Sequence, residues 1–247
     1  MEKVQLFWPR PIQQVLLGHH DLAESRLGIV IPGWIKRLFA QKRSYALNEL
    51  DIKLSKYLNQ RDGTFVEAGA NNGLRQTNTL YFEQNLGWRG LLIEPVPDLA
   101  EQCRRNRPNC IVENVALVSN DFEGDSVTLR YCNLMSVVVG AMKSKEEENE
   151  HIKKGCEVQR ISTFDIKVKV ETLSRVLDKH NLADIDLLSL DVEGYEANVL
   201  KGLDFDKHRP RYILVEARYR EDVDKVLLPQ YTSIAEFTEH DVLYRSV

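Results

Sequence analysis

Short apolar runs alternate with helical patterns along most of this chain. Runs of strand length, continuous enough to be buried on both faces of a parallel sheet, recur at regular intervals. The expected strands lie at residues 64–67, 91–93, 111–117, 185–190 and 211–217. The helical patterns between them predict helices at residues 46–59, 77–85, 97–105, 170–181, 197–202 and 223–228. This alternation predicts one doubly wound α/β domain, closed by a hairpin at 232–237 and 242–244.

One stretch interrupts the alternation and predicts an insertion at about residues 118–163. Residues 127–131 and 158–161 have the composition of short strands. Between them lies the charged run AMKSKEEENEHIKKG, residues 141–155, in which the pattern shows no core positions. Because this run leaves from the carboxyl edge of the sheet, where ligands bind, we expect a mobile lid there.

The stretch TFVEAGANNG, residues 64–73, predicts a strand, a glycine turn and a helix that starts near Leu74. Gly69 and Gly73 allow the sharp turn and the close approach of a ligand. The spacing lacks the middle glycine of a dinucleotide fingerprint, G-x-G-x-x-G. Amides at the start of a helix suit a carboxylate, and the acidic Glu67 suits an ammonium group. S-adenosylmethionine (SAM) carries both groups, so it fits better than a pyrophosphate; a strand-to-helix turn without a ligand is the alternative.

A second acidic residue ends the next strand, in the segment RGLLIEPVP. Glu94 follows the apolar run at 91–93, twenty-odd residues past the glycine turn, where an acid can accept hydrogen bonds from both ribose hydroxyls. Asn114 lies near the end of the third strand, where a side-chain amide could contact an adenine amino group. A cap at the strand end is an equally good explanation of Asn114.

Composition excludes several classes of protein. In 247 residues, 43% hydrophobic and 28% charged residues describe a globular chain, and the net charge of −4 predicts no nucleic-acid partner. The sequence has no apolar run of membrane-spanning length and no signal-peptide core. The four cysteines form no C-x-x-C pair, which predicts free thiols and a cytoplasmic location.

Residues 1–50 precede the predicted domain, which we place at 51–247. They contain Pro9, Pro11 and Pro32 and a mixed helical pattern. Their aromatic and apolar residues predict a helical extension packed on the main domain. Lining of the substrate cleft and a homodimer contact are further roles that this composition allows.

Three segments together resemble the FkbM family of SAM-dependent methyltransferases: FVEAGANNG, NTLYFEQNLGWRGLLIEPVPDL and IDLLSLDVEGYEANVLKG. The resemblance covers roughly residues 44–247. It implies a class I methyltransferase fold, which is Rossmann-like with a seven-stranded, mostly parallel sheet whose last strand is antiparallel. It also implies O-methylation of a sugar or natural-product hydroxyl, with a small-molecule or glycan acceptor. Ser189 departs from the family, which often has Lys at this position.

The resemblance also implies which residues bind the cofactor. They are Glu67, Gly69, Ala70, Asn71, Gly73, Glu94 and Asp191, with Thr77 and Asn78 as additional contacts of the SAM carboxylate. Residues 1–43 and the 118–163 insertion match the family only loosely. We therefore expect these two parts to select the acceptor.

Methyl transfer to a hydroxyl needs an aligned acceptor and, because a hydroxyl is a weak nucleophile, a base or a metal ion. Asp191, Glu193 and Glu216 lie at or beyond the carboxyl ends of central strands. Asp191 is our first choice for contact with the reacting centre, aided by Glu193 or by His151 in the predicted lid. The alternatives are a helix cap for Asp191 and a solvated loop residue for His151. Three carboxylates on one edge could also bind Mg²⁺, although the sequence has no dedicated ligand spacing.

Two other functions remain open at this stage. A nicotinamide-dependent oxidoreductase is disfavoured by the missing middle glycine. A catalytically inactive module that binds SAM or a protein partner is opposed by the presence of Glu67, Gly69, Gly73, Glu94 and Asp191.

Overall fold

The computed structural model describes residues 44–247, which form one compact unit. The predicted packing of the N-terminal extension concerns residues 1–43 and lies outside the described residues. Residues 44–50 belong to the compact unit, because Ser44 Oγ donates a 2.6 Å hydrogen bond to Asp51 and Leu50 is buried. Within the described unit, no helix combines the length and the apolar character needed to cross a bilayer.

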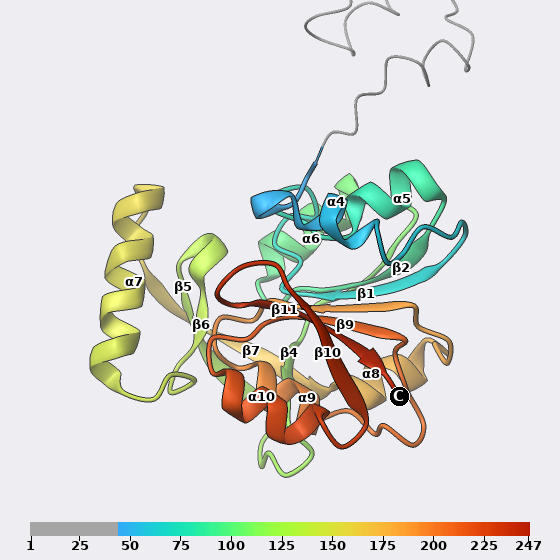
Figure 1. Ribbon diagram of the computed structural model, residues 1–247. Coiled ribbons are helices and arrows are strands. Elements are labelled where there is room, and N and C mark those ends of the chain that lie inside the picture. The colour runs from blue at the N-terminus through green and yellow to red at the C-terminus, as the bar shows by residue number, and fades with distance from the viewer. Residues whose placement is uncertain (1–43) are drawn as a thin grey trace, which may run out of the picture. The chain divides into compact units, whose positions relative to one another are not determined.

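A seven-stranded sheet forms the centre of the unit (Figure 1). Its order is β10-β11-β9-β8-β1-β2-β3. The strands are β1 (Thr64–Ala68), β2 (Arg89–Ile93), β3 (Ile111–Glu113), β8 (Leu187–Leu190), β9 (Tyr212–Glu216), β10 (Tyr231–Glu236) and β11 (Asp241–Ser246). β11 is antiparallel to both of its neighbours, and the other pairings are parallel. The mostly parallel seven-stranded sheet with an antiparallel last strand is therefore confirmed.

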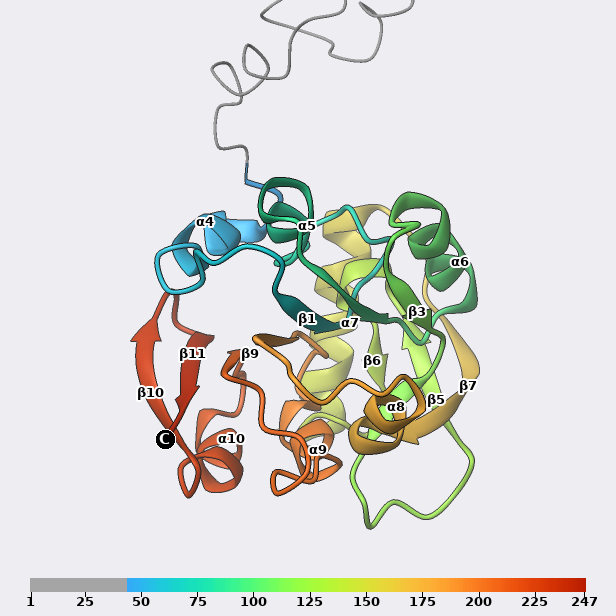
Figure 2. The ribbon, with the colours of Figure 1, turned by 90° about the vertical axis from the view of Figure 1, so that its right-hand side faces the viewer.

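Helices cover both faces of this sheet, as Figures 1 and 2 show from two sides. One face carries α4 (Leu50–Leu54), α5 (Leu80–Leu86) and α6 (Pro97–Asn106), and the other carries α8 (Leu173–Lys179), α9 (Glu196–Lys201) and α10 (Arg220–Leu227). Alternate strand residues point into two separate cores, with Val66 in one and Phe65 in the other. This two-sided burial explains why the central strands are mostly apolar.

The third strand begins at Ile111, as predicted, but it ends at Glu113 and not at Leu117, because the chain divides there between two sheets. β3 pairs with β2, whereas β4 (Ala116–Val118) pairs with β7 (Phe164–Thr172) in a second, four-stranded sheet of order β4-β7-β5-β6. The turn between β3 and β4 is held by Asn114, whose amide donates to the carbonyls of Glu94 and Pro95. The apolar run at 111–117 does not reveal in the sequence that its two halves belong to different sheets.

The insertion forms the rest of the second sheet and a long helix. β5 (Ser126–Tyr131) and β6 (Val137–Val138) are joined by the 3-10 turn η2 (Asn133–Met135), and α7 (Lys145–Gln159) follows. The predicted strand at 158–161 is wrong, because α7 continues to Gln159 and ends at Arg160, which has a positive φ. The charged run is also not free of core residues, since His151, Ile152 and Gly155 are buried. Mobility of this segment stays a prediction.

Three predicted helices begin later in the structure, among them the helix expected at 77–85, which starts at Leu80 as α5. The helix at 46–59 is reduced to a 3-10 turn, η1 (Leu47–Glu49), and to α4, because Asn48 and Glu49 adopt left-handed backbone angles. The helix predicted from residue 170 begins at Leu173, because Val170 still belongs to β7. Thr172 caps it by accepting a hydrogen bond from the Arg175 amide.

Candidate functional site

A cavity of about 470 Å³ lies at the carboxyl ends of the central strands. Its volume is in the range of small-molecule sites. It brings together residues of β1, β2 and β9 and of the turn after β8 with η2 and α7 of the insertion. Of the predicted site residues, Gly69, Asn71, Glu94, His151, Asp191 and Glu193 line it, whereas Glu67, Ala70, Gly73, Thr77 and Asn114 do not.

The loop after β1 differs from the predicted glycine turn and helix. No helix begins near Leu74, since α5 starts at Leu80. Asn71 and Gln76 adopt positive φ angles of 48° and 52°, and the Asn72 side chain accepts hydrogen bonds from the amides of Leu74 and Arg75. Such local side-chain bonds compete with helix formation. The prediction of a helix start directly after the turn is therefore wrong, and binding of a carboxylate at this loop stays a prediction.

A buried polar network holds this loop from behind. The Glu67 carboxylate accepts hydrogen bonds from the Asn78 amide and from the hydroxyls of Thr77 and Thr79, at 2.5–2.8 Å. Arg107, only 1% exposed, donates to the Gly73 carbonyl and to both threonine hydroxyls. Because these groups satisfy one another, Glu67 and Thr77 shape the loop and do not reach the cavity.

Glu94 lies at the end of β2 beside the front of the same loop. Its carboxylate accepts hydrogen bonds from the amides of Asn71 (2.8 Å) and Val96 (2.9 Å). Burial raises the pKa of Glu94 to about 7, and these two hydrogen bonds oppose that rise. The Asn71 side chain donates to Asn133 of η2, while its own Oδ1 is buried and has no partner among the described residues. A carboxylate and a buried, unpartnered amide oxygen therefore lie on this side of the cavity.

Three carboxylates meet on the other side of the cavity. Oxygens of Asp191, Glu193 and Glu216 all lie within 4.8 Å of one another, at the ends of β8 and β9. Asp191 faces the open space of the cavity, and Glu193 and Glu216 are half-buried. Desolvation, followed by repulsion from Glu216 and Glu193, raises the pKa of Asp191 well above its usual range. Desolvation and Glu216 raise the pKa of Glu193 to about 8.

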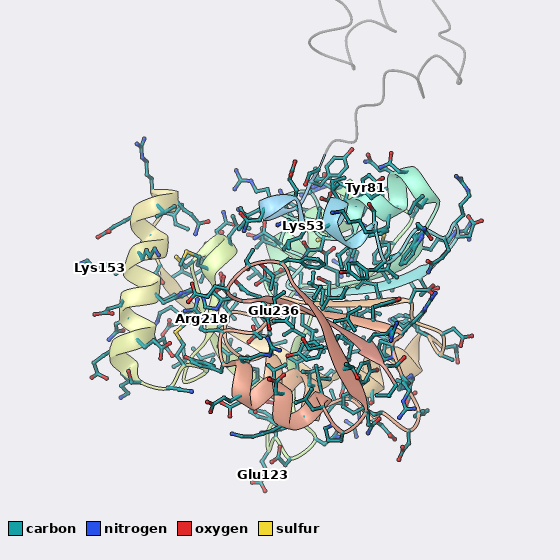
Figure 3. The ribbon with its side chains drawn as sticks, viewed as in Figure 1. Lys53, Tyr81, Glu123, Lys153, Arg218 and Glu236 are labelled. Carbon is teal, nitrogen blue, oxygen red and sulfur yellow. The ribbon has the colours of Figure 1, made fainter. Side chains whose placement is uncertain are left out.

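Arg218, which the sequence reasoning missed, connects this acidic cluster to α7. Its Nη2 lies 3.5 Å from the Glu193 carboxylate and 3.3 Å from Nδ1 of His151. Figure 3 shows Arg218 between α7 and the sheet, whereas Lys153 points outward from the same helix. A guanidinium can only donate, so His151 Nδ1 is the acceptor and Nε2 carries the proton. Nε2 lies 3.2 Å from the Met135 carbonyl and 3.3 Å from Glu193.

This geometry disfavours His151 as a base, since its basic nitrogen already accepts from Arg218. Burial, followed by the nearby Arg218 charge, lowers the pKa of His151. His151 is thus a neutral, buried residue of α7 and not a solvated loop residue. It is placed to hold the Glu193 carboxylate.

The family model described as the Methyltransferase FkbM domain matches residues 67–244. This chain belongs to the FkbM methyltransferase family. No curated protein matches the chain.

Two of the solved structures that are similar to the chain are methyltransferases. Methyltransferase FkbM from Methylobacillus flagellatus KT is 16% identical over 74% of this chain and 43% of that chain, with a TM-score of 0.43. A TehB-like SAM-dependent methyltransferase from Corynebacterium glutamicum is 13% identical over 87% of this chain and 95% of that chain, with a TM-score of 0.40. Both scores are too low to support an argument, and the chain spans less than half of the Methylobacillus protein.

The residues that the resemblance implies for the cofactor divide into two groups in the structure. Gly69, Asn71, Glu94 and Asp191 line the cavity, whereas Glu67, Ala70, Gly73, Thr77 and Asn78 do not. Ser189, where the family often has Lys, is 1% exposed and accepts a 3.1 Å hydrogen bond from Asn78. The short serine therefore fits the buried network next to Glu67, its neighbour in register across β1 and β8.

Proposed function

We propose that this FkbM family member is a SAM-dependent O-methyltransferase with a class I fold, acting on a hydroxyl of a sugar or natural-product acceptor. One observation carries the proposal. A single cavity joins a carboxylate at the end of β2 to an acidic cluster at the ends of β8 and β9. The order β3-β2-β1-β8-β9 corresponds to 3-2-1-4-5 of a doubly wound sheet, which binds ligands at this edge.

The groups on the Glu94 side fit SAM. Glu94 retains lone pairs for the ribose hydroxyls beyond its two amide contacts. The buried, unpartnered Oδ1 of Asn71 is an acceptor for an ammonium group. Gly69, with a φ of 86°, brings the backbone close to this space. SAM would supply a methyl group already activated by its sulfonium.

The acidic cluster supplies groups for the acceptor. Asp191 has a raised pKa, which brings it nearer to the value that suits a base at neutral pH. Glu193 is held by Arg218 and His151, so the carboxyl group beside Asp191 has a defined position. We assign Asp191 to orientation and deprotonation of the acceptor hydroxyl and Glu193 to its support. Alignment alone can lower the barrier by about 7–11 kcal/mol.

A divalent cation is an alternative activator at the same cluster. Three carboxylate oxygens are the donor set that Mg²⁺ prefers. They lie within 4.8 Å of one another, so small side-chain rotations would bring them to the roughly 3–4 Å separations of an octahedral site. A bound cation would also remove the repulsion that raises these pKa values.

Calorimetric titration with SAM and with NADH tests the cofactor. We expect saturable binding of SAM and none of NADH, and Glu94→Ala should weaken SAM binding by roughly 1–3 kcal/mol. Glu101→Ala, which removes an exposed glutamate from α6, is the matched control and should leave binding unchanged. NADH binding would favour the oxidoreductase. SAM binding without turnover of any hydroxyl acceptor would favour the inactive module.

A further inference from the structure

Two cysteines connect the walls of the cavity that the insertion provides. Cys132 directly precedes η2, and Cys156 lies on α7, where Figure 1 shows the helix beside β5 and β6. Their sulfur atoms are 3.6 Å apart, although 23 residues separate them in the sequence. Cys103 and Cys110 make their sulfur contacts elsewhere, with the Asn71 carbonyl and the Glu83 carboxylate.

The packing around the two sulfur atoms allows α7 to lie close to the η2 segment. A β-carbon added to Gly155 would lie 2.7 Å from the Cys132 sulfur and 3.1 Å from Met135. The glycine next to Cys156 therefore lets α7 reach the η2 segment. Gln159 stabilises the contact between α7 and η2. Its side-chain amide donates to the Cys132 carbonyl (2.9 Å), and its side-chain oxygen accepts from the Leu134 amide (3.3 Å).

We propose that Cys132 and Cys156 form a reversible disulfide that fixes α7 against η2. The sulfurs need to approach by about 1.5 Å to reach bonding distance. Both of the segments that would be joined line the cavity, η2 with Asn133, Leu134 and Met135 and α7 with His151, Lys154 and Val158. The disulfide is thus a modification that restricts the motion of η2 and α7, which form one wall of the cavity. It does not depend on the identity of the cofactor.

A hydroperoxide is the oxidant that balances the reaction. The Cys156 thiolate attacks the peroxide oxygen, which gives a sulfenic acid and releases water or an alcohol. The Cys132 sulfur then attacks the sulfenic sulfur, forms the S–S bond and expels a second molecule of water. This order follows from exposure, since Cys156 is half-buried and Cys132 is completely buried. Burial and the adjacent Cys156 raise the pKa of Cys132 to about 12, so Cys132 is the slower of the two thiols to react with the peroxide.

Peptide mapping after treatment with hydrogen peroxide tests the link. The protein is oxidised, its remaining thiols are blocked with N-ethylmaleimide, and the digest is analysed by mass spectrometry before and after dithiothreitol. We expect a peptide that joins Cys132 to Cys156 and that dithiothreitol releases. Cys156→Ser should abolish it, and Cys110→Ser, a half-buried cysteine at another site, should leave it intact. Overoxidation of Cys156 without a link, or a link to another cysteine, would overturn the proposal.

Hydrogen exchange tests the effect on the cavity wall. In the cross-linked protein, amides of α7 and η2 should exchange about tenfold more slowly, or slower still, than in the reduced protein. Amides of β10 and β11, which lie outside the closed loop, should not change. Equal exchange of α7 in both forms, with the disulfide demonstrated, would show that the bond does not fix the wall.

Discussion

A β-carbon placed on Gly69 would lie 1.8 Å from the main-chain oxygen of Asp191. The turns that follow β1 and β8 are therefore in direct contact. The Asp191 amide donates to the Ala68 carbonyl at 3.1 Å, which fixes the same approach. The glycine turn thus also sets the position of the acidic residue that we assign to the acceptor.

Gly69→Ala should destabilise the protein and weaken SAM binding together. The backbone strain at φ 86° accounts for about 1–3 kcal/mol, and the contact with Asp191 adds to it because the obstructing atom belongs to the backbone. Gly140→Ala is the matched control, since Gly140 has a φ of 85° and open space around it. Urea unfolding of both variants measures the difference. Equal losses in the two variants would mean that β1 and β8 separate easily.

Arg107 gives a prediction about the loop that faces the cavity. Arg107→Met would leave the buried carboxylate of Glu67 and the half-buried carboxylate of Glu83 without their cation, which should cost about 3–5 kcal/mol of stability. It should also weaken SAM binding, because Arg107 holds the Gly73 carbonyl and the Thr79 hydroxyl. Arg104→Met removes an exposed arginine of the neighbouring α6 and should cost less than about 1 kcal/mol. Denaturant unfolding that gives similar values for both would contradict this role.

The pH dependence of stability follows from three glutamates, two buried and one half-buried, whose pKa is raised. Burial raises the pKa of Glu94 and Glu196 from 4.5 to about 7, and that of Glu193 to about 8. A raised pKa in the folded state means that the folded protein binds more protons, so its stability is full below pH 4.5 and falls as the pH rises to about 8. Each such group contributes a slope of up to about 1.4 kcal/mol per pH unit.

Urea unfolding of the free protein across this pH range measures the slope. Glu193→Gln, which keeps the size but cannot ionise, should flatten it. Glu101→Gln, at an exposed position, should not. A stability that rises between pH 5 and pH 8 would mean that other groups dominate the linkage.

The sequence identified the sheet and the cavity edge because both depend on local patterns. Apolar runs mark buried strands, and the acids that end them lie at one edge by topology, which is why Glu94 and Asp191 were found. Arg107 and Arg218 were not found, because the sequence does not show which arginines contact a carboxylate in the folded chain and which remain on the surface. Their contacts with Glu67 and Glu193 join residues 25 or more positions apart. Only the folded chain shows such pairs.

The remaining errors come from competition between local and distant interactions. No helix forms at Leu74, because the Asn72 side chain accepts a hydrogen bond from the Leu74 amide and Arg107 donates one to the Gly73 carbonyl. The strand expected at 158–161 is helical because α7 packs its buried Ile152 and Gly155 against Cys132 and Met135. A charged run with few apolar residues gave no signal for that packing.

The last prediction concerns the chemical step. Asp191→Asn keeps the size of the side chain and removes its charge, so methyl transfer should fall by about 10²–10⁴-fold if this carboxylate acts on the acceptor. SAM affinity should change much less, since Glu94 and Asn71 lie on the other side of the cavity. Asp184→Asn is the matched control, because Asp184 is exposed near the opposite end of β8.

Parallel assays of methyl transfer with and without EDTA separate the two modes of activation. If Asp191 is a direct base, EDTA should leave the wild-type rate unchanged, and the rate should rise with pH as the carboxylate loses its proton. If Asp191, Glu193 and Glu216 hold a divalent cation, EDTA should abolish transfer and added Mg²⁺ should restore it. Near-normal turnover by Asp191→Asn would falsify both assignments, and catalysis would then rest on the alignment of the acceptor alone.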